Sequence, residues 1–204
     1  MPAASPPRYS DVQIAARQAA LRALTSGQGL AAAARAAIDT AETFLARIID
    51  AVDLHEQIAA IQCAAGCYHC CHQMVGITSA ELALAREAVD ALPEPQRGAT
   101  RARIKDMAER GRGLDQAGWW QARLRCALLD EEGRCLIHAA RPLPCRAMNS
   151  YSAETCRRSH AGERLQIPML AAQHRIHGHA QLGLAQALAE SGEDTMVVGL
   201  GTAL

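Results

Sequence analysis

The sequence has few aromatic residues and a single lysine, and each shortage limits how the chain can be interpreted. Among 204 residues there are one phenylalanine, two tryptophans and three tyrosines. The core must therefore come from smaller apolar side chains, which bury less area per residue. Lys105 is the only lysine among 21 basic residues, which indicates a coding bias that makes the alanine runs less informative. A bound metal would supply part of the stability that such a core lacks.

An excess of charge of one sign is also missing, since 21 acidic residues balance the 21 basic ones. We therefore expect no nucleic-acid partner and no binding to a membrane surface. No apolar stretch approaches the roughly 20 residues of a membrane helix. The opening MPAASPPRYSDVQ has no apolar core of a secretory signal. We expect a cytoplasmic protein whose thiols stay reduced.

The apolar periodicity predicts a mainly α protein, a helical domain with a small β-hairpin and a cysteine-rich metal-binding centre. Thr78 and Glu81 form a capping box that opens a helix ending before Pro93. Asp130 to Gly133 reads as the tight turn of the hairpin. Further helices are expected at 11–24, 30–62, 96–111 and 166–190. We divide the chain into a disordered lead (1–9), an N-terminal helical segment (10–62), a cysteine-cluster metal-binding domain (63–160), and a C-terminal helix and tail packed on that domain (161–204).

The eight cysteines are the most informative residues, and they fall into two sets. The sets are Cys63, Cys67, Cys70 and Cys71, then Cys126, Cys135, Cys145 and Cys156. If the preceding helix continued through the first set, Cys63, Cys67 and Cys70 would share one face. Adjacent side chains on a helix diverge by about 100°, so Cys70 and Cys71 fit poorly around a single zinc. This poor fit would be avoided in three ways: two metal centres lie close together, a polynuclear cluster is bound, or one cysteine of the pair lies outside the ligand shell.

The distribution of charge connects the two sets. No Asp, Glu, Lys or Arg occurs between Gln57 and Ala80, whereas the second set lies in an arginine-rich segment. Buried thiolates need compensating positive charge, so we expect the second segment to fold over the first and make one composite site. Arg141 and Arg146 are expected to bond backbone or thiolate sulfur there. His69 and His72 flank the first set as outer-shell residues, and either imidazole can replace a thiolate.

These motifs resemble a known family. CxxxCxxCC followed by CALLDEEGRCLIHAARPLPCR is similar to the YkgJ-type cysteine-cluster proteins, also called the CxxCxxCC or putative zinc- or iron-chelating domain family. The resemblance covers about residues 63–156 and implies metal chelation by the eight cysteines. Two departures are a first spacing of three residues instead of two, and His138 in place of the usual tyrosine. Some relatives are lysine methylases of flagellin, so the resemblance leaves an enzymatic role open.

The sequence thus predicts a protein that chelates iron, as an iron–sulfur cluster, or zinc, and whose redox activity stays open. Thiolates suit both metals. Eight thiols exceed the four that one structural zinc needs, which slightly favours the iron–sulfur cluster. The alternatives are a zinc-stapled module that binds an unidentified protein and a metal-dependent enzyme such as a protein methylase or an oxidoreductase. The sequence identifies no catalytic residue. The spacing of Cys63, Cys67 and Cys70 also matches the radical-SAM motif, but no βα alternation follows.

Overall fold

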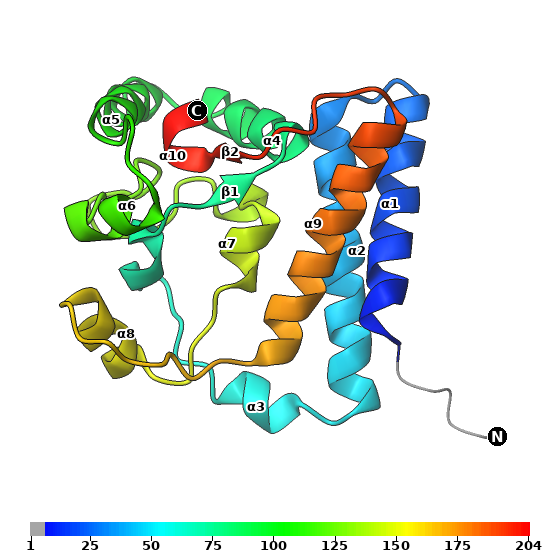
Figure 1. The fold of residues 1–204 in the computed structure, drawn as a ribbon, viewed down its shortest axis with the longest axis horizontal. Helices are drawn as coiled ribbons and strands as arrows, with labels where there is room; N and C mark the ends of the chain where they lie inside the picture. The colour runs from blue at the N-terminus through cyan, green and yellow to red at the C-terminus, as the bar shows by residue number, and fades with distance from the viewer. Residues whose placement is uncertain (1–6) are drawn as a thin grey trace.

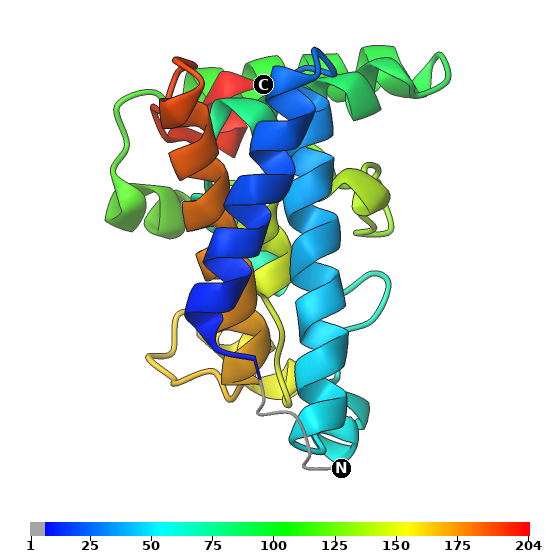
Figure 2. The same cartoon turned by 90° about the vertical axis from the view of Figure 1, so that its right-hand side faces the viewer.

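Three long helices pack side by side and form one half of the molecule. In the computed structural model, which describes residues 7–204, α1 (Tyr9–Thr25) and α2 (Leu30–Ala51) form an antiparallel pair. Helix α9 (Ala171–Glu190) packs against both, as the two views in Figures 1 and 2 show.

Alanine makes most of the contact between these helices. Ala16, Ala20, Ala37 and Ala180 are fully buried, and such short side chains let helix axes approach closely. Gly183 of α9 lies even closer to α1, because a Cβ built there would stand 2.3 Å from the backbone oxygen of Gln13. The alanine runs, uninformative as composition, therefore form the interface of this bundle.

The other half of the molecule consists of two medium-length helices and several short elements joined by irregular connections (Figure 1). Strands β1 (Gly76–Ile77) and β2 (Val198–Gly199) pair antiparallel and bring the C-terminal segment back beside residue 76. The helical elements here are α3 (His55–Ala59), η1 (His69–His72), α4 (Ser79–Asp90), α5 (Gln96–Arg110), α6 (Gln116–Ala122), η2 (His138–Ala140), α7 (Leu143–Ala147), α8 (Ala153–His160) and α10 (Leu200–Ala203).

The mainly α fold class with a small antiparallel strand pair is confirmed. The capping box is present, because Thr78 N donates to Glu81 Oε2 at 2.9 Å and Glu81 N donates to Thr78 Oγ1 at 3.3 Å. In residues 7–204, every helix is too short or too polar to cross a membrane. Of the predicted lead (1–9), residues 1–6 lie outside the described residues, and α1 begins at Tyr9.

The predicted helix over 30–62 is wrong beyond Ala51. Its apolar stripe leaves the core there, since Val52 is 47 % exposed, and Asp53 adopts a left-handed φ of 50° that breaks the helix. After the short α3, residues 60–68 form no helix. Cys63 and Cys67 therefore lie in a loop and not on a helix face with Cys70.

The position predicted for the hairpin also needs correction. The turn at Asp130 to Gly133 forms, but the residues beside it make an isolated β-bridge between Leu129 and Cys135 and do not form two strands. The last helix begins at Ala171, not near Gln166, because the preceding segment bonds elsewhere. Leu170 N donates to the Asn149 side chain at 2.7 Å.

The packing of α9 on α1 can be tested with two glycines of the same helix. Gly183→Ala should lower the free energy of unfolding by about 1–3 kcal/mol, because the new methyl group meets backbone atoms of α1. Gly178→Ala is the matched control, since nothing lies within 4 Å of a Cβ there, and it should stabilise the protein by about 0.5–1 kcal/mol. Urea denaturation measures both. Equal effects of the two substitutions would contradict the close approach.

Candidate metal centre

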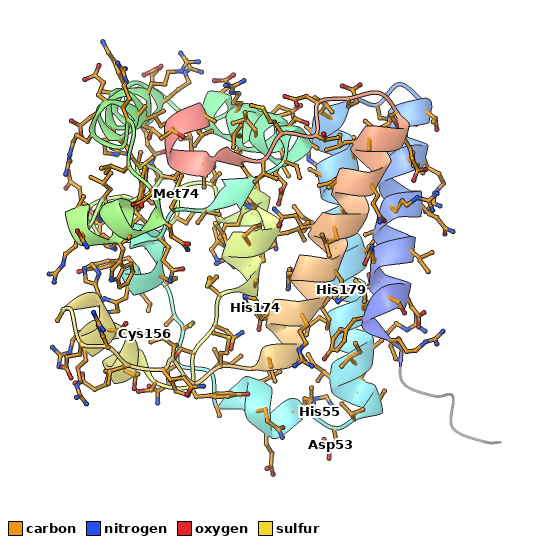
Figure 3. The ribbon with its side chains drawn as sticks, viewed as in Figure 1. Asp53, His55, Met74, Cys156, His174 and His179 are labelled. Atoms are coloured by element: carbon orange, nitrogen blue, oxygen red, sulfur yellow. The ribbon has the colours of Figure 1, made fainter. Side chains whose placement is uncertain are left out.

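Cysteines from both sets line one cavity of about 630 Å³. The first set contributes all four of its thiols, and the second contributes three, so the lining cysteines are Cys63, Cys67, Cys70, Cys71, Cys126, Cys135 and Cys145. The eighth, Cys156, lies on α8 (Figure 3). All eight are free thiols, and seven of them are partly shielded from solvent while Cys63 is exposed. The fold thus collects the sulfur atoms of two distant chain segments.

Two glycines let the cysteine loops cross in contact. Gly66 and Gly133 have φ of +85° and +78°, a region that glycine adopts without strain. A Cβ on Gly133 would stand 3.1 Å from the Gly66 carbonyl oxygen and 2.5 Å from the Tyr68 ring. A larger residue at position 133 would therefore push the two loops apart.

Backbone hydrogen bonds hold the crossing in register. Cys126 N donates to the Cys71 carbonyl at 2.9 Å, which joins the first cysteine loop to the second. Within the second loop, Leu136 N donates to Leu128 O at 2.9 Å, and Asp130 Oδ1 accepts from Arg134 N at 2.7 Å. The turn thereby returns the chain and brings Cys135 back toward Cys126.

Helix α7, which carries Cys145, is fixed at both ends. Pro142 precedes it, and Leu143 N donates to Glu81 Oε1 at 2.8 Å. Beyond Cys145, Arg146 Nε donates to the Arg141 carbonyl at 2.8 Å, and Arg146 Nη1 pairs with Glu42 at 3.0 Å. Arg146 therefore acts on the backbone beside Cys145 and does not line the cavity.

Arg141 does line the cavity, and it faces the thiols. Its buried Nε has no hydrogen-bond partner among the described residues. Burial raises the pKa of the Cys135 and Cys145 thiols, and the positive charge of Arg141 opposes that rise. A hydrogen bond with Cys71, followed by burial, raises the pKa of Cys70. Arg141 thus favours the thiolate form that a metal requires.

Without a metal, burial favours the protonated form of five thiols, those of Cys63, Cys67, Cys126, Cys135 and Cys145. It raises the pKa of Cys126 to about 11, and it is also the largest cause of the raised pKa of Cys63 and Cys67. The charges of neighbouring cysteines add to the rise at all three. Several thiolates together are stable here only if a cation compensates them. In the described residues no three His, Cys, Asp or Glu side chains are already arranged around one metal position.

The two predicted histidines lie in η1 beside Cys70 and Cys71 but do not line the cavity. The imidazole of His72 packs against that of His160, with ring centroids 4.2 Å apart, and His69 stands 5.7 Å from the same ring. Burial, followed by the nearby His160, lowers the pKa of His72. The neutral form of His72 is therefore favoured next to the adjacent cysteine pair.

Three polar residues that support the site were not foreseen. Glu81 is 1 % exposed and its capping role was predicted, but its bond to Leu143 N, 62 residues away, was not. Glu42 Oε1 lies 3.4 Å from His177 Nε2 and 3.0 Å from Arg146. His177 is 1 % exposed. In the sequence, Glu42 and His177 are marked only as polar residues within the apolar stripes of their helices, α2 and α9.

Comparison with known proteins gives one match. The family model CxxCxxCC, described as a putative zinc- or iron-chelating domain, matches residues 62–163. No curated protein and no solved structure matched the chain. The matched segment contains all eight cysteines and most of the residues that line the cavity.

The Glu42 network should make stability depend on pH. The hydrogen bond from His177 and the Arg146 ion pair lower the pKa of Glu42 from 4.5 to about 2. A lowered carboxyl pKa contributes stability that is present above about pH 4.5 and is lost as the pH falls toward 2. Glu42→Gln should therefore cost about 1 kcal/mol near neutral pH, a value limited by solvent screening of this half-exposed side chain.

This difference between wild type and Glu42→Gln should shrink as the solution is acidified, and urea denaturation at several pH values measures it. Glu87→Gln is the control, because Glu87 pairs with Arg35 at the exposed surface and should contribute little. A cost of Glu42→Gln that stays constant from neutral pH to about pH 2 would contradict the network.

Proposed function

Because the chain belongs to the CxxCxxCC family of putative zinc- or iron-chelating domains, we propose that its eight cysteines form one composite metal-binding site, which holds iron, as an iron–sulfur cluster, or zinc. The metal-chelating character follows from the family. The ligand set and the metal are our proposal. The observation that carries it is the single cavity of about 630 Å³ lined by seven thiols from two distant segments.

The residues present fit such a group. Thiolates are the ligands that iron–sulfur clusters and zinc share. The first loop has no charged side chain between Gln57 and Ala80, so the bound metal would balance the thiolate charge without competing carboxylates. Two buried donors, Arg141 Nε and Trp119 Nε1, belong to residues that line the cavity and have no acceptor among the described residues. An anionic occupant would provide acceptors for both.

We favour the iron–sulfur cluster over zinc. Eight thiols are twice the number that a closed zinc site uses. Inorganic sulfide in a cluster can accept hydrogen bonds from Arg141 and Trp119, and such bonds tune the reduction potential. A bound cluster would supply one-electron transfer. The protein would contribute the charge of Arg141, the apolar walls and the exclusion of water.

The zinc-stapled module is the second reading. The cavity joins three segments with little regular structure, around residues 61–75, 124–138 and 141–149. A structural metal would stabilise such a region where the small apolar side chains cannot. An unidentified protein partner would then use the surface that the metal holds in place.

A metal-dependent enzyme is the third reading. The cavity volume lies within the range of about 300–1,000 Å³ that small-molecule sites occupy. One wall is apolar and contains Met107, Trp119, Leu124 and Leu200. A substrate would need an open position on the metal next to this wall.

We assign the metal-binding unit to residues 63–160, with 10–62 as its helical support and 161–204 packed on it. The contact of α9 with α7 supports the last assignment, while its contacts with α1 and α2 join the same segment to the helical support. We place the protein in the cytoplasm as part of the same proposal, since its eight free thiols must stay reduced to bind a metal.

The first test is metal and acid-labile sulfide analysis, with an absorption spectrum, on protein purified without oxygen. Brown protein with equal amounts of iron and sulfide would support the cluster. Colourless protein with stoichiometric zinc would support the second reading. Cys135→Ser should release metal in either case, because its thiol lines the cavity. Protein with neither metal would contradict the proposal.

Arg141→Gln should weaken retention of the metal. The substitution removes the positive charge that faces Cys70, Cys135 and Cys145. Hydrogen bonds to charged groups contribute about 1.5–3 kcal/mol, so a chelator should extract the metal at least about tenfold more readily. Arg141→Lys keeps the positive charge, so its rate of metal extraction should lie between those of the wild type and Arg141→Gln. Arg101→Gln, at an exposed ion pair, should behave as wild type. An unchanged Arg141→Gln protein would exclude this role of Arg141.

A further inference from the structure

The cysteines of the centre differ in what anchors them. Three of them, the inner thiol group (Cys126, Cys135 and Cys145), pack against one hydrophobic core cluster. Its buried members are Ile77, Ala85, Val89, Leu128, Ile137 and Leu200. These thiols are held by side chains that cannot move without disturbing a packed core.

Three other cysteines form the outer thiol group (Cys63, Cys67 and Cys156), and among the described residues neither they nor the pair Cys70 and Cys71 belong to a core cluster. Cys63 is exposed and follows Gln62, which is tied to the start of α8. Gln62 N donates to Ser150 O at 2.9 Å, and Ala153 N donates to Gln62 Oε1 at 2.9 Å. Cys156 lies in the second turn of α8 (Figure 3). Two surface segments thus bring these thiols together.

The adjacent pair Cys70 and Cys71 lies between the two groups. Cys71 O accepts the backbone hydrogen bond from Cys126, a member of the inner group. Helix α8, which carries Cys156 of the outer group, packs against η1, where the pair resides.

We propose that the composite site consists of two metal centres of different lability, an inner centre on Cys126, Cys135 and Cys145 and an outer centre on Cys63, Cys67 and Cys156, each completed by one cysteine of the Cys70–Cys71 pair. This inference rests on the proposed function but does not depend on whether the metal is iron or zinc. It assigns one thiol of the pair to each centre because Cys71 is bonded to Cys126 of the inner group, while η1 packs against the helix that carries Cys156.

The two centres should exchange metal at different rates. The outer one opens when the loop and α8 separate at the surface, whereas the inner one opens only when a core cluster is disturbed, and local opening is less costly at sparsely packed sites. On binding of a zinc or ferrous ion, each thiol loses its proton to water as its sulfur joins the metal, so no oxidant or reductant is needed. The outer centre would therefore be the one that accepts or delivers metal.

The test follows metal release from the full-length, metal-loaded protein into an excess of a chromogenic chelator, under conditions that exclude oxygen. We expect two phases of similar amplitude whose rates differ at least about tenfold. Iodoacetamide added after the fast phase should alkylate Cys63, Cys67 and Cys156, as peptide mass spectrometry would show, and should leave Cys126, Cys135 and Cys145 unmodified. This measurement needs no substitution in the core.

Cys156→Ser should bind about half the metal of the wild type and release it in the slow phase alone, with unchanged helix content by circular dichroism. Ser159→Ala on the same helix is the matched control and should show both phases. Release in a single phase, with all eight cysteines becoming reactive together, would overturn the two-centre inference and leave the metal-binding proposal standing. Purified protein that never holds metal would overturn both.

Discussion

The carboxylate of Glu81 joins the two halves of the molecule, and the position of the cysteines depends on it. One oxygen accepts from Thr78 N and from the Gln181 side chain of α9, at 2.9 and 3.0 Å. The other accepts from Leu143 N at the start of α7, at 2.8 Å. A buried carboxylate is stable only when its acceptors are satisfied, so α4, α7 and α9 are constrained together. This constraint positions Cys145, which lies on α7 two residues after Leu143.

From that fixed point the site extends toward the surface with decreasing packing. Cys145, Cys126 and Cys135 contact a hydrophobic cluster, whereas Cys63 lies exposed in a loop. Toward the surface, the cysteine loops are held by hydrogen bonds and by close backbone contacts at glycines, most clearly between Gly66 and Gly133, and less by apolar packing. A region organised in this way needs ligand bonds to complete its stability, as expected for a chain with so few aromatic residues.

Electrostatics agrees with this arrangement. Burial raises the pKa of most of the thiols, so they stay neutral until a cation replaces their protons. Two arginines line the cavity, Arg134 and Arg141. Arg134 forms ion pairs with Asp130 and Glu132. The guanidinium of Arg141 is therefore available to balance a net negative metal–thiolate group. Helices α1 and α2 carry no cysteine, and they support the centre through α4 and α9.

Local rules determined much of the fold in advance. The apolar repeat predicted the long helices, the Thr78–Glu81 box fixed where α4 begins, and the glycine at 133 marked a turn. The cysteine motif identified the family and supplied the eight thiols that we propose as ligands, because ligand type and spacing are properties of sequence. These features depend on residues that are close along the chain.

Long-range contacts decided the remainder. No local signal announced that α2 would end at Ala51, that β1 would pair with β2 instead of a hairpin strand, or that Glu42 and Glu81 would reach Arg146 and Leu143. The separation of the thiols into an inner and an outer group has the same origin. The sequence by itself determined the chemistry that depends on short motifs. Only the tertiary structure decided which thiols pack against the core and which are exposed to water, because that depends on contacts between residues far apart in the chain.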